Sequence, residues 1–249
     1  MSAAGLGHGG DAQAALDARV AAAVAEVRDR IAIAGGGGVR LVAVTKTFGA
    51  AEVVAAARAG CDGLGENYAQ ETVGKWAELH DLLGPGGVAA LPPLHFIGQL
   101  QTNKVRSLAP LVAVYETVDR TSLVAELAKR CPGTRVLVQV DATGEPGKGG
   151  CPIADVPALT AEAVARGLRV EGLMAVGPTH GGPDAARPVF TAVRALADRL
   201  GLAVCSMGMS DDLEVAVACG ATEVRIGSAL FGPRLIGARP PQRGTGGLA

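Results

Sequence analysis

Aromatic side chains are scarce in this 249-residue sequence, at 3% of the chain, although apolar residues make up 49% of it. The interior must therefore be filled by Ala, Val, Leu and Gly, which suit close packing of helices on a sheet. No apolar run approaches the roughly 20 residues of a transmembrane helix. The first residues also lack the basic and apolar regions of a signal peptide. We therefore expect a soluble, cytoplasmic protein.

An excess of charge of one sign is also missing. The formal net charge is -1 and the sequence pI is about 6.4, and the chain has no basic cluster. We therefore expect neither nucleic acid nor a membrane as a partner. The five cysteines are odd in number and contain no C-x-x-C pair, which argues against a disulfide framework and a zinc site and favours reduced thiols.

Several catalytic motifs are absent. The histidines His8, His80, His95 and His180 are scattered, and none stands at metal-ligand spacing from another ligand, so we expect no metal site. The chain has no G-x-S-x-G elbow and no P-loop. Lysine remains as a nucleophile, and its characteristic partner is a carbonyl group, with which it forms a Schiff base.

Short apolar runs alternate with segments of helical spacing. Alternation without hairpin signals indicates a parallel sheet. Helices are expected at residues 11–33, 51–59, 121–129 and 184–200, with others ending at 79, 165 and 220, whereas the Gly/Pro-rich stretch 84–93 is expected to be a loop. The expected strands are residues 41–45, 62–65, 94–98, 112–115, 135–140, 170–175, 203–206 and 223–226.

Eight such units predict an α/β fold, a TIM (β/α)8 barrel with an extra N-terminal helix. An open doubly wound sheet is the alternative. We expect one domain over residues 1–239, with residues 1–10 as a disordered arm and residues 240–249 as a disordered tail.

Lys46 ends the first apolar strand. Burying an ammonium group costs several kcal/mol, roughly, unless it is paired or neutralised, and neutralisation makes it a nucleophile. The alternative is a side chain whose stem packs while its head reaches water. In a TIM barrel the carboxyl ends of the strands carry the functional residues, which makes this position a candidate site.

The end of the eighth expected strand resembles a phosphate site. Gly227 and Ser228 begin a short helical turn, whose free N–H groups suit a phosphate, and residues 206–210 end the preceding strand. A tight turn at Gly227 and a helix cap at Ser210 are the alternatives. A lysine opposite a phosphate cradle indicates an aldehyde that carries a phosphate, and pyridoxal 5′-phosphate (PLP) has both groups.

Five motifs, in this order and spacing, resemble those of the pyridoxal phosphate homeostasis proteins, a family similar to the barrel domain of alanine racemase. They are LVAVTKTF, GENYAQE, HFIGQLQTNK, GLMAVGP and SMGMSDDLEVAVACGATEVRIGSALFG. The resemblance covers about residues 41–234 and implies a TIM barrel that holds PLP. The loop of residues 144–151 departs from the family pattern, which leaves the role of Lys148 open.

The resemblance implies a role for each matching residue. Lys46 would form the Schiff base, Asn67 would lie beside the cofactor ring, and Arg225 would face the pyridine nitrogen. A cation at that nitrogen disfavours its protonation and weakens the ring as an electron sink. The phosphate would be held by Ser206, Gly227 and Ser228.

Two functions follow from this set. The first is a PLP carrier that stores, buffers or delivers the cofactor, with PLP-dependent apo-enzymes as conceivable recipients and no catalytic residue of its own. The second is a PLP-dependent amino-acid racemase, which needs a base on each face of the cofactor. Alanine racemase takes its second base from another domain, for which this chain has no room, although Tyr68 stands near the mouth. We favour the carrier, as a monomer.

Overall fold

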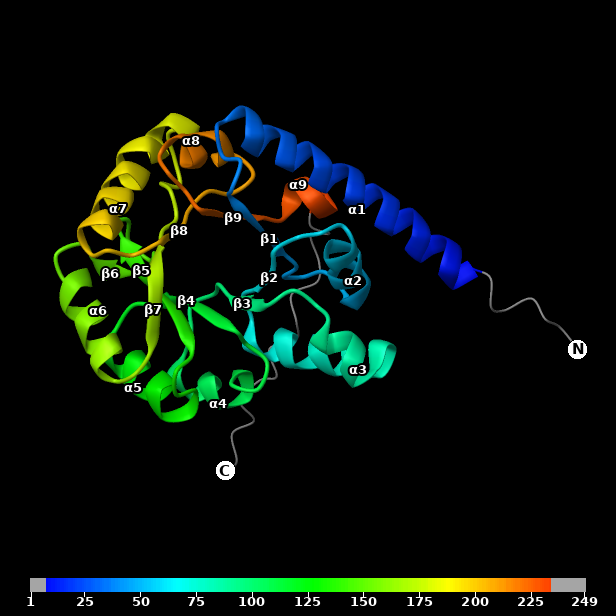
Figure 1. The fold of residues 1–249 in the computed structure, drawn as a ribbon, viewed down its shortest axis with the longest axis horizontal. Helices are drawn as coiled ribbons and strands as arrows, with labels where there is room; N and C mark the ends of the chain where they lie inside the picture. The colour runs from blue at the N-terminus through cyan, green and yellow to red at the C-terminus, as the bar shows by residue number, and fades with distance from the viewer. Residues whose placement is uncertain (1–7, 234–249) are drawn as a thin grey trace, which may run out of the picture.

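A closed ring of eight parallel strands forms the centre of the molecule, and helices cover its outside (Figure 1). The computed structural model describes residues 8–233. The strands are β1 Arg40–Val44, β2 Gly63–Glu66, β3 Leu94–Phe96, β4 Val114–Val118, β5 Arg135–Asp141, β7 Arg169–Met174, β8 Val204–Ser206 and β9 Glu223–Ile226, and the two-residue β6 Cys151–Pro152 pairs with β5.

The pairings of β1 and β4 decide between the barrel and the open sheet. β1 pairs with both β2 and β9, and β4 pairs in parallel with β5, so that the ring has no edge. The predicted TIM barrel is therefore confirmed, and the doubly wound alternative is excluded. The helices are α1 His8–Ile33, α2 Ala50–Arg58, α3 Ala69–Ala89, α4 Val105–Leu108, α5 Thr121–Arg130, α6 Val156–Ala165, α7 Arg187–Arg199, α8 Leu213–Ala218 and α9 Ser228–Phe231, with 3-10 turns at Thr102–Lys104 and Pro183–Ala186.

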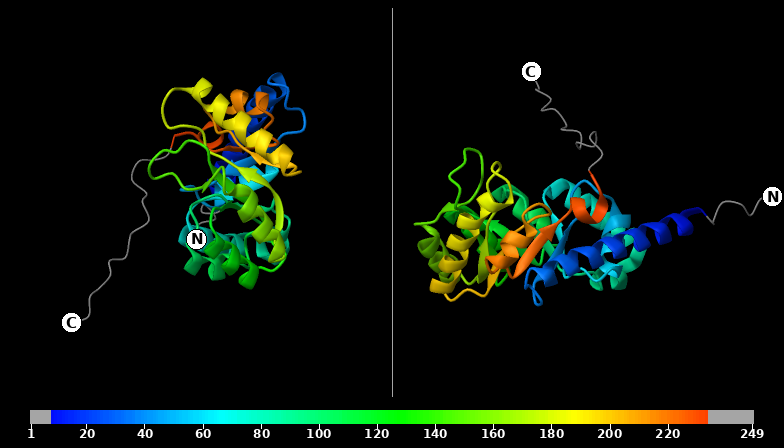
Figure 2. Two further views of the ribbon diagram at one scale, coloured as in Figure 1. Left: turned by 90° about the vertical axis from the view of Figure 1, so that its left-hand side faces the viewer. Right: turned by 90° about the horizontal axis from the view of Figure 1, so that it is seen from above.

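Helix α1 is the extra N-terminal element. Its apolar residues Val20, Val24, Val27 and Ile31 recur every three or four positions and are buried, as expected for one face of an amphipathic helix. The helix packs against α2, α8 and α9, and its first turns extend past the barrel (Figure 2). No helix within residues 8–233 has the length and apolar character needed to span a bilayer.

Several expected boundaries were wrong. Residues 8–10, assigned to a disordered arm, begin α1, whereas residues 1–7 and the expected tail 240–249 lie outside the described residues. Most of the expected loop 84–93 is helical, because Gly84 at φ 69° kinks α3 and Pro85 is tolerated in the first turn after the kink. The strand expected at 112–115 is β4, which covers Val114–Val118. Its end was predicted too early because Glu116 is charged, although this residue faces the barrel interior.

The barrel interior is divided between a small apolar cluster and a set of charges. Val114, Leu137, Met174 and Val204 pack together inside the ring, apart from the large apolar layer between strands and helices. The rest of the interior contains polar and charged residues that are almost fully buried. They are His95, Glu116, Ser206, Glu223 and Arg225.

Gly172 on β7 offers a test of the barrel packing. A Cβ at this position would stand 2.0 Å from the carbonyl oxygen of Val204 on the paired strand β8. We expect Gly172→Ala to lower the free energy of unfolding by about 2 kcal/mol or more. Gly74, exposed within α3 with nothing near its would-be Cβ, is the matched control, and Gly74→Ala should raise stability by about 0.5–1 kcal/mol. Urea unfolding measures both, and equal stability of the two variants would contradict the described packing.

Candidate functional site at the carboxyl end of the barrel

Lys46 lies in a tight turn directly after β1. The N–H of Phe48 donates to the carbonyl of Thr45, which closes the turn over Lys46 and Thr47. Thr47 has φ 68°, the only positive φ of a non-glycine residue in the described chain. Such a conformation costs on the order of 1–3 kcal/mol and is retained where surrounding contacts impose it. The turn presents the partly buried Lys46 at the mouth of the barrel.

A buried ion cluster lies under this turn. The ammonium of Lys75, from α3, donates to the carbonyl of Thr45 at 2.7 Å, to Glu66 Oε1 at 2.5 Å and to Glu71 Oε1 at 3.0 Å. Glu71 Oε1 also accepts the N–H of Thr47 at 2.6 Å, and Glu66 Oε1 accepts the hydroxyl of Thr45 at 2.6 Å. Burial raises the pKa of Glu66, although the charge of Lys75 and its hydrogen bond oppose the shift.

Asn67 follows β2 and stands next to this cluster in the chain. Its Oδ1 is buried without a hydrogen-bond partner, and so is Oγ1 of Thr47 in the Lys46 turn. A Cβ on Gly98, which follows β3, would lie 2.0 Å from the carbonyl oxygen of Asn67. Only glycine therefore allows the third loop to approach Asn67 so closely. These two oxygens, just after the ends of β1 and β2, have no hydrogen-bond partner within the described residues.

Two serine hydroxyls meet at the ends of β8 and β9. Ser228 Oγ donates to Ser210 Oγ at 3.1 Å, and the N–H of Ala229 points to the same oxygen at 3.4 Å. Gly227 lies against β1, since a Cβ there would stand 3.3 Å from the carbonyl oxygen of Val44. Ser210 is not the helix cap that we expected. Asp212 has that position before α8, and its carboxylate accepts the N–H of Met209 at 2.6 Å.

Ser206, the other serine predicted to hold the phosphate, does not lie with Ser210 and Ser228. Its side chain is fully buried in the barrel, where its hydroxyl donates to Glu116 Oε2 at 2.6 Å and accepts from Arg225 Nη1 at 2.7 Å. Arg225 Nη2 donates to the carbonyl of Ala175 at 2.8 Å. Two predicted residues, Ser206 and Arg225, are thus in direct contact, and Ser206 positions the guanidinium.

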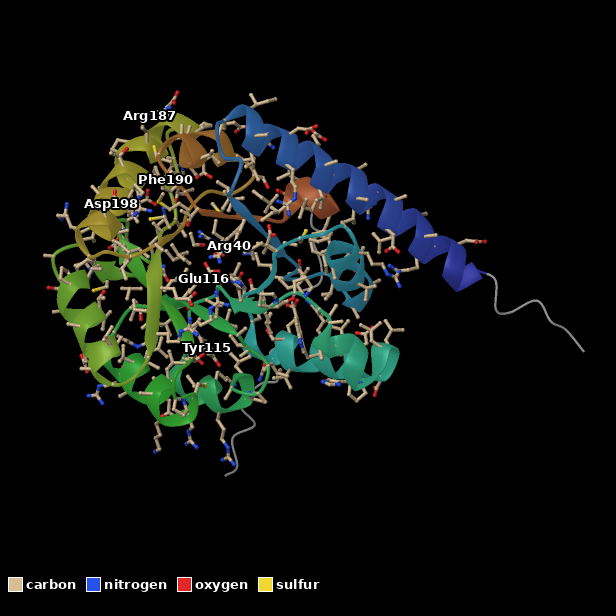
Figure 3. The ribbon with its side chains drawn as sticks, in the orientation of Figure 1. Arg40, Tyr115, Glu116, Arg187, Phe190 and Asp198 are labelled. Atoms are coloured by element: carbon tan, nitrogen blue, oxygen red, sulfur yellow. The ribbon has the colours of Figure 1, made fainter. Side chains whose placement is uncertain are left out.

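Glu116 connects this pair to the centre of the barrel. Tyr115 faces outward and contacts Cys131, whereas Glu116 and Arg40 lie within the ring of strands (Figure 3). His95 Nδ1 stands 2.6 Å from Glu116 Oε1, and Arg40 pairs with Glu223 at 3.1 Å. Although burial raises the pKa of Glu116, the hydrogen bond and charge of His95 outweigh this effect and the pKa is lowered.

His95, Glu116 and Glu223 form a group that the sequence did not indicate. Their ligand atoms lie within 4.8 Å of one another, which is a geometry that can hold a metal ion, but they come from three different strands. Sequence spacing could not find such a group. Arg40 at 3.1 Å and Arg225 at 3.9 Å already supply positive charge to the two carboxylates. The arrangement therefore works as a balanced network of buried charges.

Lys148, whose role the sequence left open, lines a small cavity at the ends of β5 and β7. The cavity has a volume of about 150 Å³ and is bordered by Gln139, Val140, Asp141, Thr143, Lys148, Gly149 and Val176. The ammonium of Lys148 donates to the carbonyl of Gly177 at 2.6 Å and pairs with Glu145 at 2.9 Å. This lysine is thus held across the loop that borders the mouth.

Comparison with known proteins agrees with this geometry. Residues 18–234 match the family model for the N-terminal domain of alanine racemase. A "Pyridoxal phosphate homeostasis protein" of Pseudomonas aeruginosa is 45% identical over 210 residues, which cover 80% of this chain and 86% of that protein. The Escherichia coli protein of the same name is 37% identical, with 85% and 95% covered. The chain belongs to the pyridoxal phosphate homeostasis protein family.

Several solved structures share the fold of this chain. A protein of Bifidobacterium adolescentis described as unknown has a TM-score of 0.79 and 34% identity, with 87% of this chain and 96% of that chain covered. PipY of Synechococcus elongatus, in a structure with PLP bound, has a TM-score of 0.70 and 30% identity, with 83% and 100% covered. Alanine racemase of Corynebacterium glutamicum, at 16% identity and a TM-score of 0.66, shares the fold.

The buried charges predict a pH dependence of stability. Burial and, to a smaller extent, the charge of Glu116 raise the pKa of Glu223 to about 7, although the charges of His95 and Arg40 oppose the shift. An unfolded glutamate titrates near pH 4.3, roughly, so the native state binds this proton more tightly between about pH 4.5 and 7. The contribution of Glu223 to stability therefore falls as the pH rises through that window.

We expect the stability of Glu223→Gln relative to the wild type to increase by about 1–3 kcal/mol between pH 5 and pH 8. Urea unfolding at both pH values measures the difference. Glu78→Gln, on the exposed side of α3, should show no such change. A flat difference for Glu223→Gln would show that Glu223 is ionised throughout this range.

Proposed function

We propose that this protein binds PLP through a Schiff base on Lys46 and stores, buffers or delivers the cofactor inside the cell. The observation that carries the proposal is the position of Lys46, in a strained turn at the mouth of a barrel whose relative PipY is solved with PLP bound. Family membership supports the same conclusion. PLP supplies an aldehyde for the lysine and a phosphate that needs hydroxyl and N–H donors.

The residues at the mouth fit such a ligand. The unpartnered oxygens of Asn67 and Thr47 lie on the Lys46 side, in agreement with a polar ring beside Asn67. Ser210, Ser228 and the N–H of Ala229 offer donors for a phosphate, and Gly227 keeps the chain close to β1. We assign phosphate binding to Gly227, Ser228 and Ser210, and give Ser206 the task of holding Arg225, because its hydroxyl is fully engaged there.

Arg225 favours a carrier over an enzyme. A guanidinium remains protonated at any working pH. Facing the ring nitrogen, it would keep that nitrogen unprotonated, and the ring would then stabilise negative charge poorly. Ser206, Ala175 and, at 3.9 Å, Glu116 fix the guanidinium in place. The racemase alternative requires Tyr68, which is 47% exposed beside Asn67, to act as a base. Turnover of D- or L-amino acids above the rate of free PLP would establish it.

We further propose a monomer in the cytoplasm that passes PLP to apo-enzymes. All five cysteines are free, which suits a reducing compartment. The seven large exposed apolar residues of the described chain are spread from Ile33 to Met209 over several elements, which is typical of the surface of a monomer. Sedimentation of the protein alone tests whether it is a monomer. Sedimentation with a PLP-dependent apo-enzyme tests whether the two proteins bind each other.

Replacing Lys46 tests the proposed Schiff base. The wild-type protein incubated with PLP should gain the visible absorption of a PLP Schiff base, and Lys46→Ala should lose it entirely. Lys129→Met, an exposed lysine on α5, serves as the control and should keep the wild-type spectrum. An unchanged spectrum of Lys46→Ala would place the linkage on another lysine.

A further inference from the structure

Lys75 is a buried lysine that the proposed function does not use. Its side chain is 4% exposed, and its ammonium lies 2.7 Å from a carbonyl and 2.5 and 3.0 Å from two carboxylates. Three donated hydrogen bonds satisfy all three N–H groups of an ammonium. All three are engaged by protein oxygens, which makes Lys75 poorly suited to be a nucleophile itself.

The contacts of Lys75 fall on both sides of Lys46. The carbonyl of Thr45 precedes Lys46 and accepts directly from Lys75. The N–H of Thr47 follows Lys46 and donates to Glu71, which Lys75 also binds. The two neighbours of Lys46 are thus tied to α3 through one ammonium and one carboxylate. This tie holds Thr47 at its positive φ.

The same cluster reaches the next strand. Glu66 Oε1 accepts from Lys75 and from the hydroxyl of Thr45, and Glu66 is the last residue of β2, directly before Asn67. Lys75 therefore connects the ends of β1 and β2, which carry Lys46 and Asn67. The bond from Lys75 to Glu66 spans nine residues of sequence, and the bond from Lys75 to Thr45 spans 30.

We propose that Lys75 is a positioning residue for Lys46, which fixes the turn so that the Lys46 amine reaches an aldehyde bound at the mouth. This inference rests on the proposed function. In the reaction, the neutral amine of Lys46 adds to the aldehyde carbon, a C=N bond forms and the carbonyl oxygen leaves as water. Correct placement of the two reacting groups is what makes such a step favourable at low ligand concentration.

Two ligands separate positioning from simple structural support. PLP has the aldehyde, whereas 4′-deoxypyridoxine 5′-phosphate has a methyl group in its place and the same ring and phosphate. Loss of positioning should weaken PLP and leave the analogue unaffected. For Lys75→Met we expect PLP affinity to fall by about tenfold or more, and the affinity of the analogue to change by less than about threefold. Calorimetry measures both.

Glu71→Leu is the second variant, because Lys75→Met leaves two carboxylates without their cation and can prevent folding. The side chain of Glu71 is 16% exposed, and its replacement removes the acceptor of the Thr47 N–H. Lys75 retains its ion pair with Glu66 in this variant. We expect the same selective loss of PLP affinity. Lys129→Met, on the exposed side of α5, is the control and should bind both ligands like the wild type.

The outcomes are distinct. Equal loss of both ligands in Glu71→Leu or Lys75→Met, or no loss of PLP affinity, overturns the positioning role. In a Lys46→Ala background the second substitution should no longer weaken PLP, and a remaining effect would show that Lys75 acts elsewhere. If the wild type binds the analogue as tightly as PLP and forms no adduct reducible by borohydride, the proposed function fails instead.

Discussion

A charged side chain that is buried needs an oppositely charged or hydrogen-bonding partner, and this requirement explains most of the polar structure of the barrel. Breaking a buried ion pair costs about 3–5 kcal/mol, because it leaves one charge uncompensated. In the interior, Glu116 pairs with His95, and Glu223 pairs with Arg40. Under the mouth, Lys75 meets Glu66 and Glu71. Lys75 and Glu71 share α3, but in each of the other pairs the two partners come from different elements, so that the charges also fix how the elements are arranged.

The two networks serve the two ends of the proposed ligand. The Lys75 cluster supports the turn that carries Lys46, where an aldehyde would be bound. The Glu116 network holds Arg225 through Ser206, where the ring nitrogen would lie. A fixed guanidinium at that nitrogen suits a protein that binds the cofactor without activating it. The same fold can therefore serve storage in one protein and catalysis in another, depending on the residues at a few strand ends.

The sequence predicted the elements that depend on local pattern. Eight apolar runs alternating with helices were sufficient for the barrel, and the same pattern was sufficient to place Lys46 and Gly227 just after the ends of β1 and β9. It failed where the decisive contact joins distant residues. Ser206 bonds to Glu116 across 90 residues, and no spacing rule shows that this serine faces the interior while Ser210 meets Ser228. The role of Lys75 was missed for the same reason. Gly84 was taken for the start of a loop because a glycine and a proline together are more often a turn than a kink.

The proposed covalent link between Lys46 and PLP can be located by chemical trapping. The protein is incubated with PLP, reduced with borohydride, digested and analysed by mass spectrometry for the modified lysine. We predict one pyridoxyl group per chain, on Lys46. A pyridoxyl group on Lys75 or Lys148 in place of Lys46, or no modification at all, would contradict it.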